Sequence, residues 1–424
     1  MRKLGLRKPP LGWNSFDSFD DDLNEKHFYE NLEVFIEKLK PAGYECFVID
    51  ISWYIIRDGE KIDYAMDEWG RYLPSPTNFP NGFETMIQRT HDAGLKFGLH
   101  LMRGVPHKAV DNRMPILGTG GITANMIVNN DPEDHCPWGD MNIGIDLSKP
   151  GGQEYYDSVI KQMAEWGVDF IKYDDIEGNP GEMAAVYQAI DKVDYEITLS
   201  FSPGGYRYIN GQIPLKAYTG ANMIRITHDI WDNRADLEDA FEAWIKRSIQ
   251  EPDRPPWFFF DLDMVPFGRL RKTKDDERDC NLTSAQKRTF ITQRALAASP
   301  LFMGGHLPET DEYSFSLLTN TRMLACNQNA VIGHPVCRRG PFHVFRTPEK
   351  GMGQGKGWIG VFNRTEAEVN GTFDTYMLGL DRLNSSYHIY DIWNEREFTL
   401  EKGKGGIQAA LAGDDVLFLR YERM

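Results

Sequence analysis

The sequence predicts a (β/α)8 TIM barrel followed by a C-terminal antiparallel β-sandwich domain. Short apolar runs alternate with amphipathic stretches through most of the 424 residues, a pattern typical of parallel strands joined by helices. About eight such units occur, the number that closes a barrel. From about residue 333 the pattern changes to alternating runs bounded by turns, as in antiparallel sheets. We therefore expect a barrel domain over 1–328 and a sandwich over 329–424.

Eight apolar runs are the predicted barrel strands. They are LGWNSF (11–16), CFVIDISWY (46–54), LKFGLHLM (95–102), VDFIKYDD (168–175), EITLSFSP (196–203), NMIRITHDI (222–230), PWFFFDLDM (256–264) and SPLFMGG (299–305). The clearest helices between them place apolar side chains on one face at Phe28, Leu32, Phe35 and Leu39 and at Tyr155, Val159, Met163 and Trp166. An open doubly wound sheet is the main alternative, but the first run lacks the Gly-rich turn of that fold.

The C-terminal domain is predicted from five alternating runs. They are GWIGVFNRTE, NGTFDTYML, SSYHIYDIWN, REFTLEKGKGG and DVLFLRYE. Turn residues separate the runs, as expected for strands joined by short connections.

A long connection, residues 103–152, follows the third predicted strand. It has about fifty residues and is rich in Gly, Pro, Asn and Asp. A loop of this length in a compact domain usually covers a binding site. The loop could serve its own subunit or a neighbouring one, since the chain could form a homo-oligomer.

The charge of the chain excludes several classes of partner. With 47 basic and 63 acidic residues, the net charge of −16 opposes binding to nucleic acids or anionic membranes and suits a neutral small-molecule or oligosaccharide substrate. No apolar run reaches 18 residues, and the N-terminal stretch MRKLGLRKPPLGWNS lacks the apolar core of a signal peptide. The five cysteines are scattered, so we expect free thiols and a cytoplasmic protein.

The fourth predicted strand ends in charged residues. Catalytic groups of a barrel lie at the carboxyl ends of its strands, and this run ends with Lys172, Asp174 and Asp175. Because side chains alternate along a strand, Lys172 and Asp174 share one face and Asp175 lies off it. If that face is the interior, Lys172 favours the ionised form of Asp174, which suits a nucleophile.

The sixth run offers a second carboxylate. Arg225, Thr227 and Asp229 share one face, and His228 points the other way. Two inward carboxylates are the arrangement of glycosidases, in which their separation decides between retention and inversion. A metal site, a structural salt bridge and a helix cap remain open readings of the same residues. The histidines and the cysteine between residues 100 and 136 match no standard zinc spacing, so no metal or cofactor is expected.

Seven segments, in the same order, resemble glycoside hydrolase family 27, the α-galactosidases and α-N-acetylgalactosaminidases, or a close relative in its clan. They are LGWNSF, FVIDISW, WGVDFIKYDD, RITHDIWD, DLDM, ASPLFMGG with LLTNTRMLACNQNAV, and GWIGVFNRT. The resemblance covers nearly the whole chain. It implies a retaining exo-glycosidase that needs no metal and releases terminal α-linked N-acetylgalactosamine or galactose.

The resemblance implies a role for each matching residue. Asp174 would be the nucleophile that forms a glycosyl-enzyme, and Asp229 would be the general acid and then the base. Asp50 would hold the O4 and O6 side of the sugar. The residues expected to bind substrate are Trp13, Phe16, Asp50, Trp53, His100, Lys172, Ser202, Gly205, Tyr206 and Arg225.

Several positions depart from the family's pattern. Ile51 stands where a second aspartate usually follows Asp50, which removes one acceptor for a sugar hydroxyl. His100 replaces a tyrosine. Ile176 replaces a cysteine, so Cys136 lacks the disulfide partner that the family would supply.

These departures leave the substrate open. Ser202 and Gly205 resemble the small residues that make room for an N-acetyl group, so we expect α-N-acetylgalactosaminidase or α-galactosidase activity. Ile51 keeps a β-L-arabinopyranoside, which lacks the C6 hydroxymethyl, as an alternative. A non-hydrolytic sugar-binding protein on the same barrel is the alternative from another class, and a metal-dependent hydrolase is a weaker one.

Overall fold

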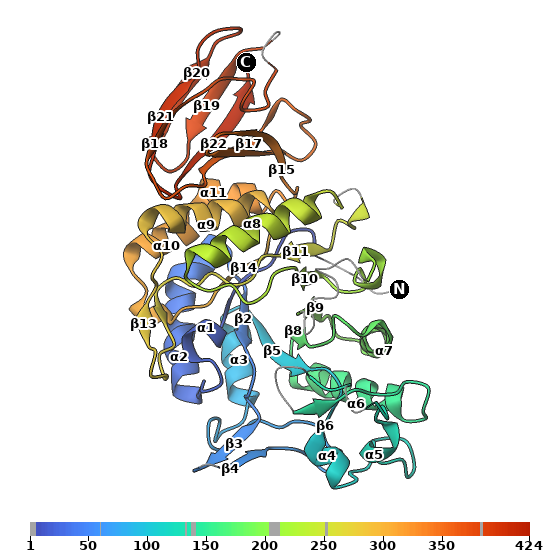
Figure 1. The fold of residues 1–424 in the computed structure, drawn as a ribbon. Coiled ribbons are helices and arrows are strands. Elements are labelled where there is room, and N and C mark those ends of the chain that lie inside the picture. The colour runs from blue at the N-terminus through green and yellow to red at the C-terminus, as the bar shows by residue number, and fades with distance from the viewer. Residues whose placement is uncertain are drawn as a thin grey trace.

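The computed structural model describes residues 6–59, 61–131, 134–136, 141–202, 213–250, 253–381 and 385–424. A parallel barrel with its helices forms the larger part, and a β-domain built from the C-terminal strands lies at one end of it (Figure 1). The predicted fold class is therefore confirmed. The proposed domain boundary after residue 328 falls between the last helix of the barrel and the first strand of the β-domain.

Each of the eight predicted apolar runs contains a barrel strand. The strands are β1 (Leu11–Asn14), β2 (Cys46–Ile49), β5 (Lys96–Met102), β8 (Phe170–Asp174), β9 (Thr198–Phe201), β10 (Met223–Arg225), β11 (Phe259–Asp261) and β14 (Leu301–Met303). They pair in parallel in the order β11-β10-β9-β8-β5-β2-β1-β14. The segment after β11 joins β14, because Val265 forms a parallel bridge with Met303 and its N–H donates to Phe302 O at 2.8 Å. This contact closes the ring.

Helices cover the outside of the barrel, and short ones also lie in the 103–152 connection. They are α1 (Phe16–Phe19), α2 (Glu25–Val34), α3 (Glu84–Asp92), α4 (His107–Asp111), α5 (Ala124–Ile127), α6 (Gly152–Trp166), α7 (Pro180–Asp191), α8 (Arg234–Ser248), α9 (Ser284–Leu296), α10 (Glu312–Leu318) and α11 (Thr321–Asn327), with short turns η1 (Phe35–Leu39), η2 (Lys40–Ala42), η3 (Leu215–Ala217) and η5 (Leu307–Glu309). The apolar face predicted from Phe28 to Leu39 is fully buried, although the helix widens into a π-turn at η1. Gly43 then ends it in a left-handed conformation.

Small two-stranded antiparallel sheets flank the barrel in the part of the chain that the structure describes. They are β3 (Ile55–Asp58) with β4 (Lys61–Tyr64), β6 (Val105–Pro106) with β7 (Asn142–Ile143), and β12 (Arg269–Leu270) with β13 (Arg278–Asp279). The long 103–152 connection contains β6, α4, α5 and β7, so it has secondary structure of its own.

The C-terminal domain consists of two antiparallel sheets. The larger has the order β15 (His334–Arg339), β16 (Phe342–Pro348), β17 (Lys356–Asn363), β22 (Val416–Arg423), β19 (Tyr387–Asp391), β20 (Arg396–Leu400), and the smaller pairs β18 (Val369–Phe373) with β21 (Ile407–Leu411). Their buried side chains form a second hydrophobic core.

Helices α8 and α9 lie directly beneath this domain (Figure 1). Trp244 of α8 stacks on Phe345 with ring centroids 4.1 Å apart. Arg288 of α9 binds the carboxylate of Asp415 at 2.7 and 3.0 Å. Apolar and charged contacts therefore both hold the two domains together. No helix among the described residues is long and apolar enough to cross a membrane.

Candidate active site

The carboxyl ends of β2, β5, β8 and β10 bring together most of the polar residues predicted for the site. In a barrel these ends form one mouth, where side chains from different strands converge. The register confirms the neighbourhood, since His100 pairs with Lys172 and Met102 pairs with Asp174 across β5 and β8.

Asp174 is a buried and ionised carboxylate. The residue is 9% exposed, Nε2 of His100 lies 3.3 Å from its Oδ2, and the N–H of Asp175 donates to its Oδ1 at 2.8 Å. Burial alone would raise the pKa of Asp174. The hydrogen bond and charge of His100, followed by the charges of Lys172 and Arg225, outweigh burial and lower that pKa. Asp174 therefore carries its charge at neutral pH, as a nucleophile requires.

Asp50 forms a second ionised centre at the end of β2. Its Oδ2 accepts hydrogen bonds from Lys172 Nζ at 2.8 Å and Asn14 Nδ2 at 2.7 Å, while its Oδ1 accepts from the N–H of Ile51. Burial opposes the charge of Asp50, but Lys172 lowers its pKa overall. The Lys172 ammonium also lies 5.6 Å from the ring centre of Phe16. Charged groups and an aromatic ring thus sit together, a combination suited to sugar hydroxyls and an apolar sugar face.

Asp229 lies in a different environment. Its side chain is 56% exposed, whereas that of Asp174 is 12% exposed. The Arg225 guanidinium donates to the Asp229 carboxylate and also contacts Asp263 Oδ2 at 3.2 Å. Asp263 is itself fixed by the N–H of Ile230 at 2.8 Å. One carboxylate is therefore enclosed and the other reaches solvent, where water and a departing group can meet it.

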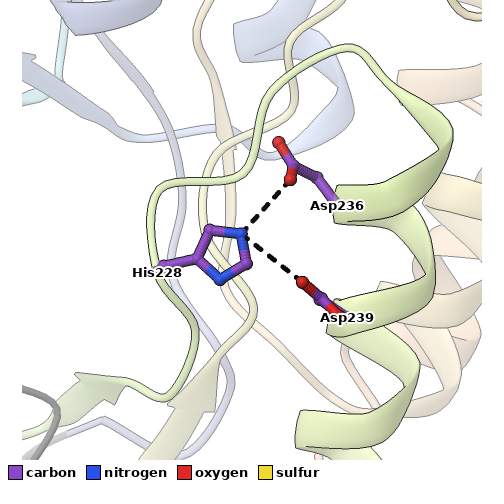
Figure 2. A group of neighbouring side chains, drawn as sticks. All are labelled: His228, Asp236 and Asp239. Atoms are coloured by element: carbon purple, nitrogen blue, oxygen red, sulfur yellow. Dashed lines mark hydrogen bonds and ion pairs between the residues drawn. The ribbon is translucent and has the colours of Figure 1, made fainter.

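His228 points away from Arg225 and Asp229, as the sequence predicts, although β10 ends at Arg225 and His228 lies in the segment after it. Figure 2 shows its ring turned toward helix α8, with Nε2 3.2 Å from Asp236 Oδ1 and 3.8 Å from Asp239 Oδ2. These three groups are close enough to share a cation. Asp236 lies in the first turn of α8, where a carboxylate is favoured, and its Oδ2 accepts a hydrogen bond from the N–H of Trp231 at 2.8 Å. These contacts explain the position of the Asp236 side chain without a bound ion.

Two predicted sugar-binding residues lie in the core instead. Trp13 is fully buried, stacks on Phe47 at 4.5 Å and donates from Nε1 to Gly305 O. Because Asn14 of β1 faces inward to Asp50, the preceding Trp13 faces the helix layer.

Trp53 is the second such residue, at 1% exposure. Its Nε1 donates to His100 O at 2.8 Å, and its ring packs among aromatic rings. Those rings belong to Tyr54, Tyr72, Phe83 and Trp166. Trp53 therefore supports the strand that carries His100 and offers no face to a sugar.

The remaining predicted residues divide into two groups. Phe16 is partly exposed, and the centre of its ring lies 6.2 Å from that of Trp231. Ser202 is buried, and its N–H donates a hydrogen bond to Tyr173 O. Gly205 and Tyr206 lie outside the described residues.

A small cavity of about 20 Å³ lies inside the barrel beneath the mouth. Its walls include Lys172, Ser202 and Arg225 together with Asp261 and Asp263. Burial, followed by the charge of Asp263, raises the pKa of Asp261 to about 7. Asp261 is thus partly protonated at neutral pH.

The sequence argument missed Asn14 and Trp231 at the mouth. Asn14 ends β1 and binds Asp50 at 2.7 Å, and the alternation with Gly12 was the signal that could have placed it. The ring of Trp231 contacts that of Phe16, although Phe16 comes about 215 positions earlier in the chain, and no local spacing predicts such a contact.

The chain is similar to known glycosidases. A family model described as "Alpha galactosidase A" matches residues 137–329. An α-galactosidase of Coffea arabica is 24% identical over 97% of this chain and 93% of its own length. An α-N-acetylgalactosaminidase of Rattus norvegicus is also 24% identical, over 76% of this chain and 69% of its own length.

Two solved structures are similar over almost the whole chain. A glycoside hydrolase family 27 β-L-arabinopyranosidase of Geobacillus stearothermophilus, in complex with arabinose, is 31% identical with a TM-score of 0.88 and covers 99% of this chain and 98% of its own. A Bacillus halodurans protein provisionally assigned as an α-N-acetylgalactosaminidase is 29% identical with a TM-score of 0.83, covering 98% and 97%.

Proposed function

The chain belongs to glycoside hydrolase family 27, and from this premise we propose that it is a retaining exo-glycosidase acting on terminal sugars of galactose configuration. One observation carries the proposal. At the mouth of the barrel Asp174 is enclosed and held ionised by His100, whereas Asp229 is exposed beside Arg225. Two carboxylates in such different environments suit two different roles.

In the proposed reaction Asp174 attacks the anomeric carbon of the bound sugar. The glycosidic bond breaks as Asp229 donates a proton to the departing oxygen, and a glycosyl-enzyme ester forms on Asp174. Asp229, now ionised, removes a proton from water, which attacks the same carbon and releases the sugar and the Asp174 carboxylate. Two inversions at one carbon give overall retention.

The charged residues around Asp174 would bind the hydroxyls of the sugar. Lys172 and Asp50 form a buried pair with a hydrogen bond of 2.8 Å. A sugar hydroxyl can donate to the carboxylate and accept from the ammonium, so it can join this pair without leaving a charge unpaired. Phe16 would cover an apolar face of the ring.

We propose N-acetylgalactosamine or galactose as the terminal sugar, α-linked to a small-molecule or oligosaccharide aglycone. Relatives with both activities support this class. Ser202 directly follows β9 and has a small side chain, the feature that the resemblance associates with acceptance of an N-acetyl group.

A β-L-arabinopyranoside is the second candidate, because of Ile51. This side chain has no acceptor for a C6 hydroxyl, and its N–H is already used by Asp50 at 2.8 Å. A pentopyranoside has no C6 hydroxymethyl and loses nothing at this position. The β-L-arabinopyranosidase relative at 31% identity favours the same reading.

The proposal also covers the cellular location and the oligomeric state of the enzyme. Among the described residues, which include all five cysteines, there is no disulfide. This supports a cytoplasmic location, where thiols stay reduced. A homo-oligomer is also proposed, and light scattering of the purified chain would test it.

A panel of aryl glycosides tests the proposal. The panel contains α-galactoside, α-N-acetylgalactosaminide and β-L-arabinopyranoside, and NMR follows the anomer of the first product. We expect turnover of at least one with retention, and none by Asp174→Ala. Equal turnover by that variant would contradict the role of Asp174, and sugar binding without any hydrolysis would favour a non-hydrolytic sugar-binding protein.

A further inference from the structure

We propose that Arg103 is a positioning residue, which fixes the Asp174 carboxylate by holding the main chain on both sides of Asp175. The inference rests on the proposed function and deepens it, since it assigns a role to a residue that contacts neither substrate nor the reacting atoms. Arg103 follows β5 directly and is 4% exposed.

Arg103 donates hydrogen bonds to the main chain around the nucleophile. The N–H of Arg103 donates to Asp174 O at 3.0 Å, and its Nε donates to Asp175 O at 2.9 Å. Between these two carbonyls, the N–H of Asp175 donates to Asp174 Oδ1 at 2.8 Å. The main-chain N–H of Arg103 therefore holds the peptide group that carries the Asp175 N–H, and its side chain holds the next peptide group. Rotation of either peptide would turn the Asp175 N–H away from the Asp174 carboxylate.

This segment needs such support because its conformation is unfavourable. Asp175 has φ of +57°, in the left-handed region that residues with a Cβ seldom adopt. Strain of this kind persists only where surrounding contacts enforce it. Arg103 supplies them, since it also binds the Asp175 carboxylate at 3.1 Å.

Arg103 is itself held by two further carboxylates. Its Nη1 donates to Glu182 Oε1, in the first turn of α7, at 2.8 Å and to Asp134 Oδ1, in the 103–152 loop, also at 2.8 Å. Glu182 is fixed in turn by the hydroxyl of Tyr156. The Arg103 cluster, comprising Arg103, Asp134, Asp175 and Glu182, therefore joins strand, helix and loop behind the nucleophile.

The surrounding chain leaves room for this cluster and no more. A Cβ at Gly144 would lie 2.2 Å from Asp134 Oδ2 and 2.5 Å from Arg103 Nη1. Contacts of this length are not tolerated, so a glycine at 144 is what allows the loop to approach Arg103.

An arginine is required by this geometry. The planar guanidinium donates in several fixed directions at once, to one carbonyl and three carboxylates, whereas a lysine offers a single nitrogen on a flexible stem. Arg103→Lys keeps the charge but cannot hold the Asp175 carbonyl and the Glu182 and Asp134 carboxylates together. This substitution therefore tests the positioning role of Arg103 while the positive charge at residue 103 is kept.

The test is the steady-state kinetics of Arg103→Lys on the aryl glycoside that the wild type hydrolyses. We expect kcat to fall about 100-fold, the loss typical of a displaced catalytic group, with KM changed by less than about 3-fold. Arg288→Lys, at the domain contact with Asp415, is the matched control and should keep wild-type kcat.

A crystal structure of Arg103→Lys supplies a readout independent of activity. The proposal predicts a displaced Asp175 carbonyl, which loses its hydrogen bond from the Arg103 side chain, and loss of the 3.3 Å contact between His100 and Asp174. Should this variant not fold, Arg103→Lys combined with Asp134→Asn, which removes one partly buried negative charge beside the lysine, takes its place.

Wild-type kcat in the substituted protein, or an unmoved Asp174, would overturn the role of Arg103. Absence of hydrolysis by the wild type would instead overturn the proposed function, and the crystal structure would still decide whether Arg103 positions Asp174. The two failures are therefore distinguishable.

Discussion

Nε2 of His100 lies 3.3 Å from Oδ2 of Asp174, and the His100 side chain is almost wholly buried beneath the mouth of the barrel. The two residues come from neighbouring parallel strands, β5 and β8. This contact is the leading attractive influence that lowers the pKa of Asp174 against the effect of burial. It connects the fold of the barrel to the charge state of the proposed nucleophile.

Replacing His100 by Phe should therefore move the pH profile. Without the hydrogen bond the pKa of Asp174 rises, so the acid limb of kcat/KM shifts to higher pH and activity at pH 5 falls by about 10- to 100-fold. His100→Gln can still present a donor and should shift the limb less. An acid limb that stays in place in His100→Phe would show that this contact does not set the ionisation.

Ile51→Asp should alter sugar preference. The new carboxylate offers an acceptor for a C6 hydroxyl, so the ratio of kcat/KM for α-galactoside to that for β-L-arabinopyranoside should rise about 10-fold or more. Ile51→Leu keeps the apolar character and should leave the ratio near that of the wild type. An unchanged ratio in Ile51→Asp would remove the argument for a pentopyranoside.

Asp175 should make folding stability depend on pH. Burial is the main cause that raises its pKa from 3.8 to about 6 in the folded protein. The folded state therefore binds more protons than the unfolded state between these values, and the contribution of Asp175 to stability falls as pH rises through this window. The fall amounts to at most about 3 kcal/mol.

Asp175→Asn removes this titration and tolerates the left-handed backbone. The free energy of unfolding of the variant minus that of the wild type should increase from pH 4 to pH 7, as measured by urea denaturation at several pH values. The exposed Asp111→Asn serves as the control and should show no such change. A difference for Asp175→Asn that decreases over this range would contradict the assignment.

Phe16 and Trp53 should respond oppositely to substitution. Phe16→Ala removes a partly exposed ring near Lys172 and should raise KM about 10-fold with little loss of stability. Trp53→Phe removes a buried hydrogen bond to His100 O and should cost about 1–3 kcal/mol in unfolding free energy while KM stays within about 2-fold. A selective rise of KM in Trp53→Phe would place that ring back at the sugar.

The strands and the faces of their side chains could be predicted from the sequence because they follow local periodicity. Alternation alone puts Lys172 and Asp174 on one face and turns His228 toward α8, and the structure agrees on both. The same rule, applied to β1, would have placed Trp13 on the helix side. Motif resemblance grouped it with Phe16 because both lie in one short segment.

The Arg103 cluster could not be predicted, because its members are far apart in the chain. Asp134 lies 31 positions from Arg103 and Glu182 lies 79 positions away. Their meeting depends on the path of a long loop and on the placement of α7, which no local pattern encodes. The π-turn at Phe35–Leu39 is a smaller example, since helix and π-turn bury the same apolar face.

The most direct test of the central claim is to trap the glycosyl-enzyme. The wild type is incubated with the 2-deoxy-2-fluoro glycosyl fluoride of the sugar it hydrolyses, digested with protease and mapped by mass spectrometry. The account predicts one fluorosugar attached to the peptide that contains Asp174, and none in Asp174→Ala. Hydrolysis of the substrate with the label on Asp229, or on any other residue, would contradict it.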